Sequence, residues 1–252
     1  MVIARLERPY RVRFDEAGPD GLLRSSGYLR YAQDLAWIHS ESEGFGREWY
    51  GERGLTWLVR GIELDVLGEV PYGYEVTVST QVIGFRRMWA RRRSEFHARD
   101  SERPLALAIT DWVLLNGRGM PTRVPAEIAD AFIDSNTDFT PIRLDDSPPP
   151  DDAQRLELAV RRSELDPMAH VNNAAYLDYL DEQYFADADP RTPLVTPRRY
   201  RAEFIASAEP HTQLVGRMWR VGAACVYRLE SESGSEMLRA SLETDPASWV
   251  GG

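Results

Sequence analysis

An internal duplication constrains this chain of 252 residues more than any other feature. Each half contains a strand-like segment, one long segment of helical period and then a run of strand-like segments. The two helical segments share the pattern Tyr-Leu-x-Tyr, at Tyr28–Tyr31 in the first half and at Tyr176–Tyr179 in the second. A long helix with a single apolar stripe needs a curved sheet to cover that stripe. We therefore predict an α+β fold in which each half is a long helix wrapped by a curved antiparallel sheet, and the two halves pair as a pseudo-dimer with one continuous sheet.

The expected elements follow the same order in both halves. In the first half we expect a strand at 9–15, a helix from Ser25 or Ser26 to about Glu43, strands at 56–66, 74–85, 87–98 and 105–116, and a short helix at 125–132. In the second half we expect a strand at 155–162, a helix at about 173–187, and strands at 197–207, 212–221, 223–231 and 237–244. The predicted domains are 1–134 and 155–252. The linker between them, 135–154, is rich in Pro and Asp and is not expected to bury a core.

The two halves differ in chemistry just before their long helices. Asp166, His170, Asn172 and Asn173 lie in a short polar turn before the second helix, whereas the first half has Arg24-Ser25-Ser26. A proline in the turn excludes a regular helix there, and an Asn side chain can cap the first helical N–H groups. A single active site would therefore belong to the second half. The alternative is a capped helix with a solvated histidine.

The bulk composition argues against several classes of protein. The formal net charge of −10 argues against general affinity for nucleic acid. A single cysteine, Cys225, excludes an intramolecular disulfide and a cysteine-based zinc site, and its strand-like setting indicates a buried, inert thiol. No window approaches the roughly 20 apolar residues of a membrane span, and the charged N-terminal residues are unlike a signal peptide. We expect a cytoplasmic protein without metal or cofactor.

The polar turn resembles the motif of a known enzyme family. Residues 165–176, Leu-Asp-Pro-Met-Ala-His-Val-Asn-Asn-Ala-Ala-Tyr, are similar to the pattern Leu-Asp-x-Asn-x-His-Val-Asn-Asn-x-x-Tyr of the acyl-acyl-carrier-protein thioesterases, which have a double hotdog fold. Supporting similarities lie in the first half, at 44–46, 57–60, 111–116 and 123–128. The resemblance implies two tandem hotdog domains, hydrolysis of fatty acyl thioesters, and acyl carrier protein as the partner that presents the substrate.

The resemblance also implies roles for individual residues. The catalytic Asp and His of the family fall on Asp166 and His170, and a later catalytic Glu falls on Glu203, in the stretch Tyr-Arg-Ala-Glu. The family Asn falls on Met168, which cannot supply the same hydrogen bond and is counted here as a substrate-binding candidate. One of the two neighbouring asparagines could fill the role of that Asn. Otherwise the enzyme is slow or altered, or hydrolysis has been lost.

Hydrolysis of a thioester needs an activated nucleophile and donors for the oxyanion. Glu203 or His170 could act as the general base for water, or a carboxylate could attack directly to form an anhydride. N–H groups in the first turn of the second long helix could hold the oxyanion. Asp166 would orient His170, although it could simply close the turn. Glu203 could equally be a surface charge paired with Arg199 or Arg201.

Two further sets of residues are candidates for substrate binding. An acyl chain needs an apolar tunnel, and the aromatic residues of the first half, Trp57 among them, could line it or could be ordinary core. A basic run at 86–93 also stands out in this acidic chain. Strand alternation places Arg87, Arg91 and Arg93 on one face and Arg92 on the other. The three could dock an acidic carrier protein, or they could form a solvated strand face.

Three functions stay open at this stage. We favour an acyl-ACP thioesterase over an acyl-CoA thioesterase of the same fold and over a non-hydrolytic protein that binds acyl thioesters. The methionine at position 168 keeps the third function open. The chain could be a monomeric pseudo-dimer or a homodimer.

Overall fold

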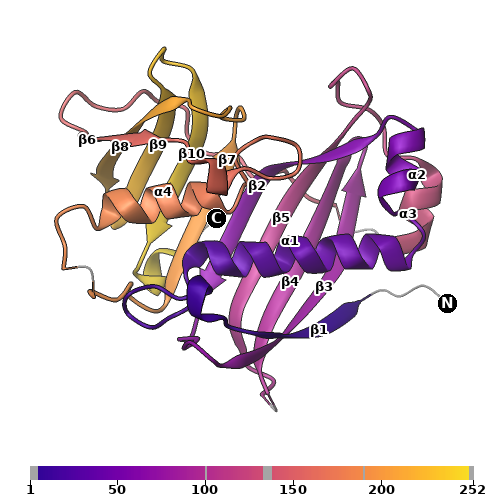
Figure 1. The fold of residues 1–252 in the computed structure, drawn as a ribbon, viewed down its shortest axis with the longest axis horizontal. Helices are drawn as coiled ribbons and strands as arrows, with labels where there is room; N and C mark the ends of the chain where they lie inside the picture. Colours follow the sequence, from indigo (N-terminus) through magenta and orange to yellow (C-terminus); the bar gives the residue numbers. More distant parts are fainter. Residues whose placement is uncertain (1–4, 100, 133–137, 190, 250–252) are drawn as a thin grey trace.

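The two halves form one continuous antiparallel sheet, as predicted (Figure 1). A computed structural model describes residues 5–99, 101–132, 138–189 and 191–249. Within these ranges the sheet has ten strands in the order β1-β3-β4-β5-β2-β7-β10-β9-β8-β6, so that β2 and β7 join the halves. The long helices α1 and α4 lie on the same face of the sheet. The predicted α+β fold is confirmed.

The elements have the following bounds. The first half contains β1 (Leu6–Arg11), α1 (Ser25–Ser42), α2 (Arg47–Glu52), β2 (Thr56–Val66), β3 (Glu75–Arg86), β4 (Trp89–Ala98), β5 (Pro104–Leu115) and α3 (Ala126–Phe132). The second half contains β6 (Gln154–Ala159), α4 (Ala175–Tyr184), β7 (Arg198–Phe204), β8 (Gln213–Val221), β9 (Ala224–Ser231) and β10 (Glu236–Glu243). Short 3₁₀ turns lie at Phe14–Glu16, Arg162–Glu164 and Pro246–Trp249. No helix among the described residues is long and apolar enough to cross a membrane.

The predicted starts of the long helices need correction. The N-cap residues are Arg24 for α1 and Ala174 for α4, and neither helix has a side-chain cap. The hydroxyl group of Ser25 donates instead to the Tyr200 hydroxyl across the molecule, at 2.8 Å. Asn172 Oδ1 accepts a hydrogen bond from the backbone N–H of Ala174, at 2.9 Å, and so shapes the turn before the helix. Helix α2 was not predicted, because its short sequence lacks a clear apolar period.

The duplication is visible in individual contacts as well as in topology. Glu16 accepts hydrogen bonds from the backbone N–H of Arg13 and from the Tyr31 hydroxyl. In the second half, Glu164 accepts the same pair from Arg161 and Tyr179. Each residue in the second-half contacts follows its first-half counterpart by the same number of residues, and β6 follows β1 by that same number. The same spacing relates the β-bridge at 17 and 23 to the bridge at 165 and 171 as well. The polar motif is therefore the second-half version of the loop at 17–23.

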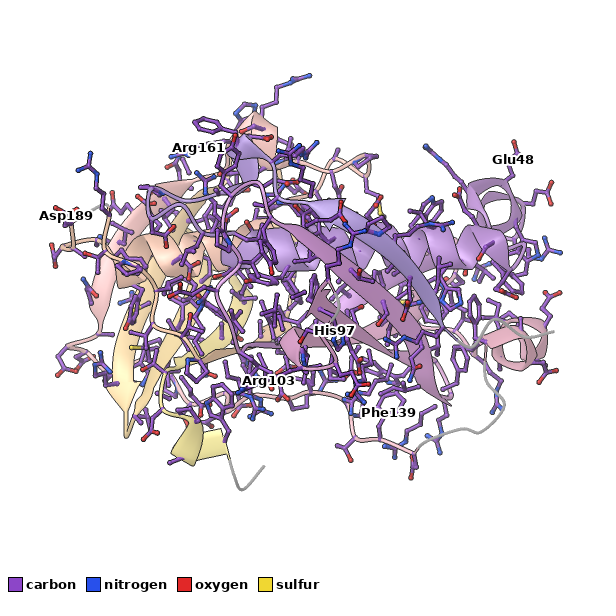
Figure 2. The ribbon with its side chains drawn as sticks, turned by 90° about the horizontal axis from the view of Figure 1, so that it is seen from below. Glu48, His97, Arg103, Phe139, Arg161 and Asp189 are labelled. Atoms are coloured by element: carbon purple, nitrogen blue, oxygen red, sulfur yellow. The ribbon has the colours of Figure 1, made fainter. Side chains whose placement is uncertain are left out.

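The predicted linker does contain buried residues, which the sequence argument did not anticipate. Residues 138–147, here called the strap, lie against the face of the sheet opposite the helices (Figure 2). Phe139 and Ile142 are each only 8% exposed. The backbone N–H of Ile142 donates to Asp111 Oδ2 at 2.7 Å, and Arg91 donates to both oxygens of Asp111 at 2.6 and 2.7 Å. A buried carboxylate thus fixes the strap, and two apolar residues of the strap extend the core.

Gly61 makes room for the strap at the join between the halves. It pairs with Asp111 of β5 on one side and with Glu203 of β7 on the other. A Cβ atom at Gly61 would lie 2.9 Å from Ile142 Cβ and 3.5 Å from its carbonyl oxygen. Such a contact requires movement of the strap, because Cβ is fixed to the backbone.

We predict that Gly61→Ala lowers the free energy of unfolding by about 1–3 kcal/mol, the usual cost of overpacking a core. Thermal or denaturant unfolding would measure the change. Gly51→Ala is the matched control, since a Cβ at Gly51 meets no atom within 4 Å. Its effect should stay within about 1 kcal/mol. Equal stability of Gly61→Ala and the wild type would show that Ile142 does not pack against the sheet.

A polar cluster holds α1 and α4 together above the β2–β7 join. Tyr200 donates from its hydroxyl to Asp181 Oδ1 at 2.7 Å, and Arg30 of α1 lies 3.4 Å from Asp178 of α4. Burial of the carboxyl group raises the pKa of Asp181 to about 6. The folded state therefore binds this proton more tightly than the unfolded chain does.

This shift predicts how stability depends on pH. The contribution of Asp181 is fully present below its unfolded pKa and is lost as the pH rises through about 6. Acidification from about pH 7.5 to about pH 5 should therefore stabilise the wild type by about 1 kcal/mol through this group. Denaturant unfolding curves would measure the free energy of unfolding at both pH values. In Asp181→Asn the increase on acidification should be smaller by the contribution of this group. An identical pH profile for the two proteins would contradict the shift.

Candidate active site

A large cavity lies between α1 and the first-half sheet. Its volume is about 880 Å³. Apolar and aromatic side chains dominate its walls, including Trp57 of β2, Phe85 of β3, Trp112 of β5 and Phe132 of α3. The second-half motif reaches the same cavity through Asp166, Pro167, Met168 and Asn172. A cavity in one half thus meets the polar turn of the other half.

The space beneath α4 is filled instead of hollow. Gln183 of α4 and Tyr227 of β9 are buried there, with exposures of 1% and 0%. Both reach Gly216 of β8, where a Cβ atom would collide with Gln183 Oε1 and with the Tyr227 hydroxyl. The duplication therefore keeps the architecture of both halves but leaves the large cavity in the first.

Asp166 holds the motif loop in shape. Its Oδ1 atom accepts hydrogen bonds from the backbone N–H groups of Met168, at 2.8 Å, and of His170, at 3.3 Å. Its own N–H donates to the carbonyl of His170 at 2.8 Å. Ala169 adopts a left-handed φ of 62°, where the duplicate loop has Gly21 at 79°. The turn-closing role weighed for Asp166 is therefore real, and it fixes the backbone that carries His170.

His170 is half-buried, and its neighbours in the loop line the cavity on either side of it. Among the described residues, no hydrogen bond or ion pair engages its imidazole ring. An imidazole on a fixed backbone with its nitrogens unengaged can take a proton from water or give one to a leaving group.

Met168 lies at the rim of the cavity. It is 53% exposed, and Trp37 of α1, also on the lining, is 42% exposed. The side chain that replaces the family Asn is thus apolar and contacts the entry of the cavity. Trp57 lies inside, where its Nε1–H donates to the Tyr50 hydroxyl at 3.0 Å.

A second, small pocket of about 30 Å³ lies on the other side of the motif. It opens where β2 and β7 diverge after their last pair, Gly61 with Glu203. Asn173 and Tyr176 line it from the helix side, and Arg60 lines it from β2. Arg60 is the extra residue of a β-bulge, and its Nη1 donates to the carbonyl of Ile205 at 2.9 Å. The strand pattern of the sequence indicates no role for Arg60, since a bulge cannot be seen in such a pattern.

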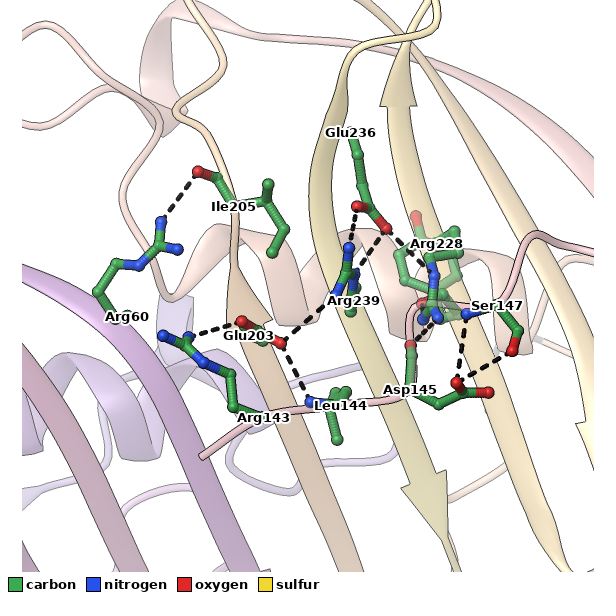
Figure 3. A network of polar contacts seen from close by, with 11 residues as sticks. Arg60, Arg143, Leu144, Asp145, Ser147, Glu203, Ile205, Arg228, Glu236 and Arg239 are labelled. Atoms are coloured by element: carbon green, nitrogen blue, oxygen red, sulfur yellow. Dashed lines mark hydrogen bonds and ion pairs between the residues drawn. The ribbon is translucent and has the colours of Figure 1, made fainter. Parts of the chain in front are cut away.

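Glu203 lies on the outer face of β7, next to this gap (Figure 3). Its Oε1 atom accepts from Arg143 at 2.6 Å and its Oε2 atom from the backbone N–H of Leu144 at 3.0 Å. The partners suggested from the sequence, Arg199 and Arg201, pair instead with Asp65 and Glu63 of β2. Glu203 is only 3% exposed, so the alternative of a surface charge is wrong. Its catalytic role stays a prediction.

The basic run has the predicted alternation along β4 but is not a free patch. Arg91 and Arg93 lie on the outer face, and Arg92 is buried on the inner face. Arg91 is bound to Asp111, and Arg93 pairs with Glu95 at 2.7 Å. Arg87 lies in the turn before β4, with a left-handed φ of 54°, and not in the strand. The outer-face arginines therefore lie across the sheet from the cavity.

The start of α4 offers fewer free donors than the sequence suggested. The N–H groups of Ala174 and Ala175 donate to Asn172, and that of Leu177 donates to Ala174. Asn173, at the small pocket, can supply a side-chain donor in their place. Among the described residues, no cluster of His, Cys, Asp or Glu side chains is placed to hold a metal ion.

Fold and site together define a thioester hydrolase of the double hotdog type, with an apolar cavity beside an acid–histidine–asparagine loop. The sequence matches the model of the acyl-ACP thioesterase N-terminal domain over residues 4–133 and that of the C-terminal domain over residues 147–205. The chain belongs to the acyl-ACP thioesterase family.

Individual relatives agree with this family. The chain is 26% identical to a chloroplastic dodecanoyl-[acyl-carrier-protein] hydrolase of Cinnamomum camphora, over 95% of this chain and 67% of the relative. A putative oleoyl thioesterase from Lactobacillus plantarum has the same fold, with a TM-score of 0.81, 16% identity, and coverage of 96% of this chain and 97% of the other. The 12:0-ACP thioesterase from Umbellularia californica has a TM-score of 0.77 and 23% identity, over 95% of this chain and 96% of the other.

The motif loop yields a paired prediction on activity. We expect His170→Ala to lower turnover of an acyl thioester by about 10² or more, because it removes the unengaged imidazole. Met168→Asn should keep activity or raise it, since methionine supplies no hydrogen bond that the change could remove.

Steady-state hydrolysis, with circular dichroism and unfolding curves to confirm folding, would measure both variants. Turnover like that of the wild type in His170→Ala would remove this residue from the mechanism. A folded but inactive Met168→Asn protein would show that the site has been rebuilt around methionine.

Proposed function

We propose that this protein hydrolyses fatty acyl thioesters carried by acyl carrier protein and releases the free fatty acid. The observation that carries the proposal is the meeting of the first-half cavity with the second-half motif loop at Asp166, Met168 and Asn172. The family and the names of the relatives support it. We place this step in fatty acid synthesis in the cytoplasm, as expected from the sequence.

In this proposal the acyl chain lies in the cavity under α1, with its thioester at the motif loop. His170 takes a proton from a water molecule, and the resulting hydroxide attacks the carbonyl carbon. Side-chain donors of the loop, with Asn172 at the cavity and Asn173 at the small pocket as the candidates, hold the negative charge that develops on the carbonyl oxygen. The C–S bond then breaks, and the sulfur leaves as the thiol of the carrier with the proton returned from His170.

Glu203 enters the proposal as a second candidate for the base. It lies on the outer face next to the gap that Arg60 lines, but the strap engages both of its oxygens and Arg239 of β10 lies 3.8 Å from Oε2. The Arg143 side chain is 51% exposed but that of Glu203 is only 4% exposed, so release of Arg143 has a cost, because it leaves the buried carboxylate less compensated. Release of Arg143 would free Oε1 for chemistry.

A pair of variants separates chemistry from anchoring at this carboxylate. Glu203→Gln removes the base and its ion pairs with Arg143 and Arg239, whereas Arg143→Met removes the shorter ion pair and leaves the carboxylate. If Glu203 is catalytic, Glu203→Gln should lose about 10² or more in kcat relative to Arg143→Met at similar Tm. Equal losses of activity and of Tm in both variants would assign Glu203 to anchoring the strap.

The carrier preference depends on the charged surface around the entry. Arg47 is exposed and lines the cavity, on the same face as Trp37 and Met168. Arg87, Arg91 and Arg93 were the docking residues predicted from the sequence, and the last two lie on the opposite face. Contacts to an acidic carrier would be sensitive to salt.

A hydrolysis panel of acyl-ACP and acyl-CoA substrates, from short to long chain, tests the function. We expect a higher kcat/KM for acyl-ACP that falls as salt is added, and a selective loss for acyl-ACP in Arg47→Gln. A loss in Arg93→Gln instead would place docking on the outer face. Equal rates for both donors would favour a general acyl thioesterase, and binding of a non-hydrolysable acyl analogue without turnover would favour the binding protein.

A further inference from the structure

The far side of the acyl cavity contains a charged group that a plain hydrocarbon chain does not require. Arg92 of β4 is 9% exposed and lines the cavity from its inner face. Its Nη1 atom lies 2.9 Å from His39 Nδ1 and donates to Thr80 Oγ1 at 3.2 Å. Ser94 donates to the same Thr80 oxygen at 3.3 Å. Arg92 alone of these four side chains lines the cavity, and His39, Thr80 and Ser94 form a buried polar network behind it.

Among the described residues, no carboxylate is placed to neutralise the charge of Arg92. A guanidinium group can only donate, so His39 Nδ1 must accept this hydrogen bond. The imidazole ring is therefore neutral, with its proton on Nε2. Within the part of the chain that the structure describes, no carboxylate lies within ion-pair distance of Arg92. The ring of Phe132 lies 5.9 Å away. Burial lowers the pKa of Arg92 to about 10, so the group stays protonated at neutral pH.

An isolated buried cation is costly unless hydrogen bonds or an opposite charge compensate for the loss of water. The hydrogen bonds described for Arg92 use Nη1 alone, while the guanidinium has five donors. A saturated chain pressed against this group would remove water from it and return no hydrogen bond. A chain that carries an acceptor oxygen would satisfy it.

The topology places Arg92 away from the site of hydrolysis. The motif loop belongs to the second half and approaches the first-half sheet from the side of β2. Strands β5 and β4 follow β2 in the sheet, so Arg92 is two strands further on, or about 10 Å. A chain whose thioester lies at the motif would meet Arg92 with its distal carbons.

We propose that the cavity takes fatty acyl chains whose distal part carries an oxygen function, such as a hydroxyl, oxo or carboxylate group, which accepts hydrogen bonds from Arg92. The proposal rests on the proposed function, because it takes the motif loop as the position of the thioester. Arg92 is then a specificity-determining residue for an oxygenated acyl substrate. The alternative is that the Arg92 side chain only forms a wall that limits chain length.

Binding tests the proposal without depending on hydrolysis. The probes are non-hydrolysable thioether analogues of acyl pantetheine, with saturated, ω-hydroxy and ω-carboxy chains of matched length. Trp57 and Trp112 line the cavity, so tryptophan fluorescence can follow binding. We expect the oxygenated analogues to bind about tenfold more tightly than the saturated one at the optimal length. Arg92→Met should abolish this preference, Arg92→Lys should keep part of it, and the exposed-site control Arg103→Met should keep all of it.

Saturated analogues that bind the wild type as tightly as the oxygenated ones would overturn the proposal, and this comparison needs no variant. A preference that persists in folded Arg92→Met would also overturn it. Failure of the proposed function would give a separate result: the oxygenated analogues would still bind more tightly, but no acyl thioester would be hydrolysed.

Discussion

The pairing of β2 with β7 is the interaction on which the rest of the structure depends. It joins two half-sheets into one, and it brings the motif of the second half to the cavity of the first. On the inner face, Tyr200 and Asp181 hold the two long helices above this join. On the outer face, Asp111 and Glu203 flank Gly61, and each accepts a backbone N–H from the strap. The strap thus bridges both halves at the one position where a missing side chain leaves room.

The two halves of the duplication share one architecture but differ in the features that form the site. Both halves keep the same Arg–Glu–Tyr contact and the same loop before the long helix. The first half has a hollow beneath its helix, while Tyr227 and Gln183 fill that space in the second. The second loop carries Asp166 and His170, whereas the first has Gly18 and Leu22 at the matching positions. One motif loop and one apolar cavity therefore meet in a single candidate site.

Local patterns in the sequence predict most of this fold, because alternation and helical period report directly on burial. The strand at 56–66 was predicted with its observed bounds, and the duplication led to the continuous sheet. The strap was misjudged, since Phe139 and Ile142 are isolated apolar residues in a polar segment and have no period of their own. The surroundings of Glu203 and Arg92 depend on contacts between residues far apart in the chain. Alternation placed Arg92 on the face opposite Arg91 and Arg93, but only the packing of α1 and α3 shows that this face lines a cavity.

A crystal structure with a non-hydrolysable acyl thioether analogue tests the central claim most directly. We expect electron density for the acyl chain under α1, in the first-half cavity, with the carbonyl group beside the loop at 166–173. A chain seated elsewhere, or a carbonyl out of reach of His170 and both asparagines, would contradict a composite site formed by the two halves.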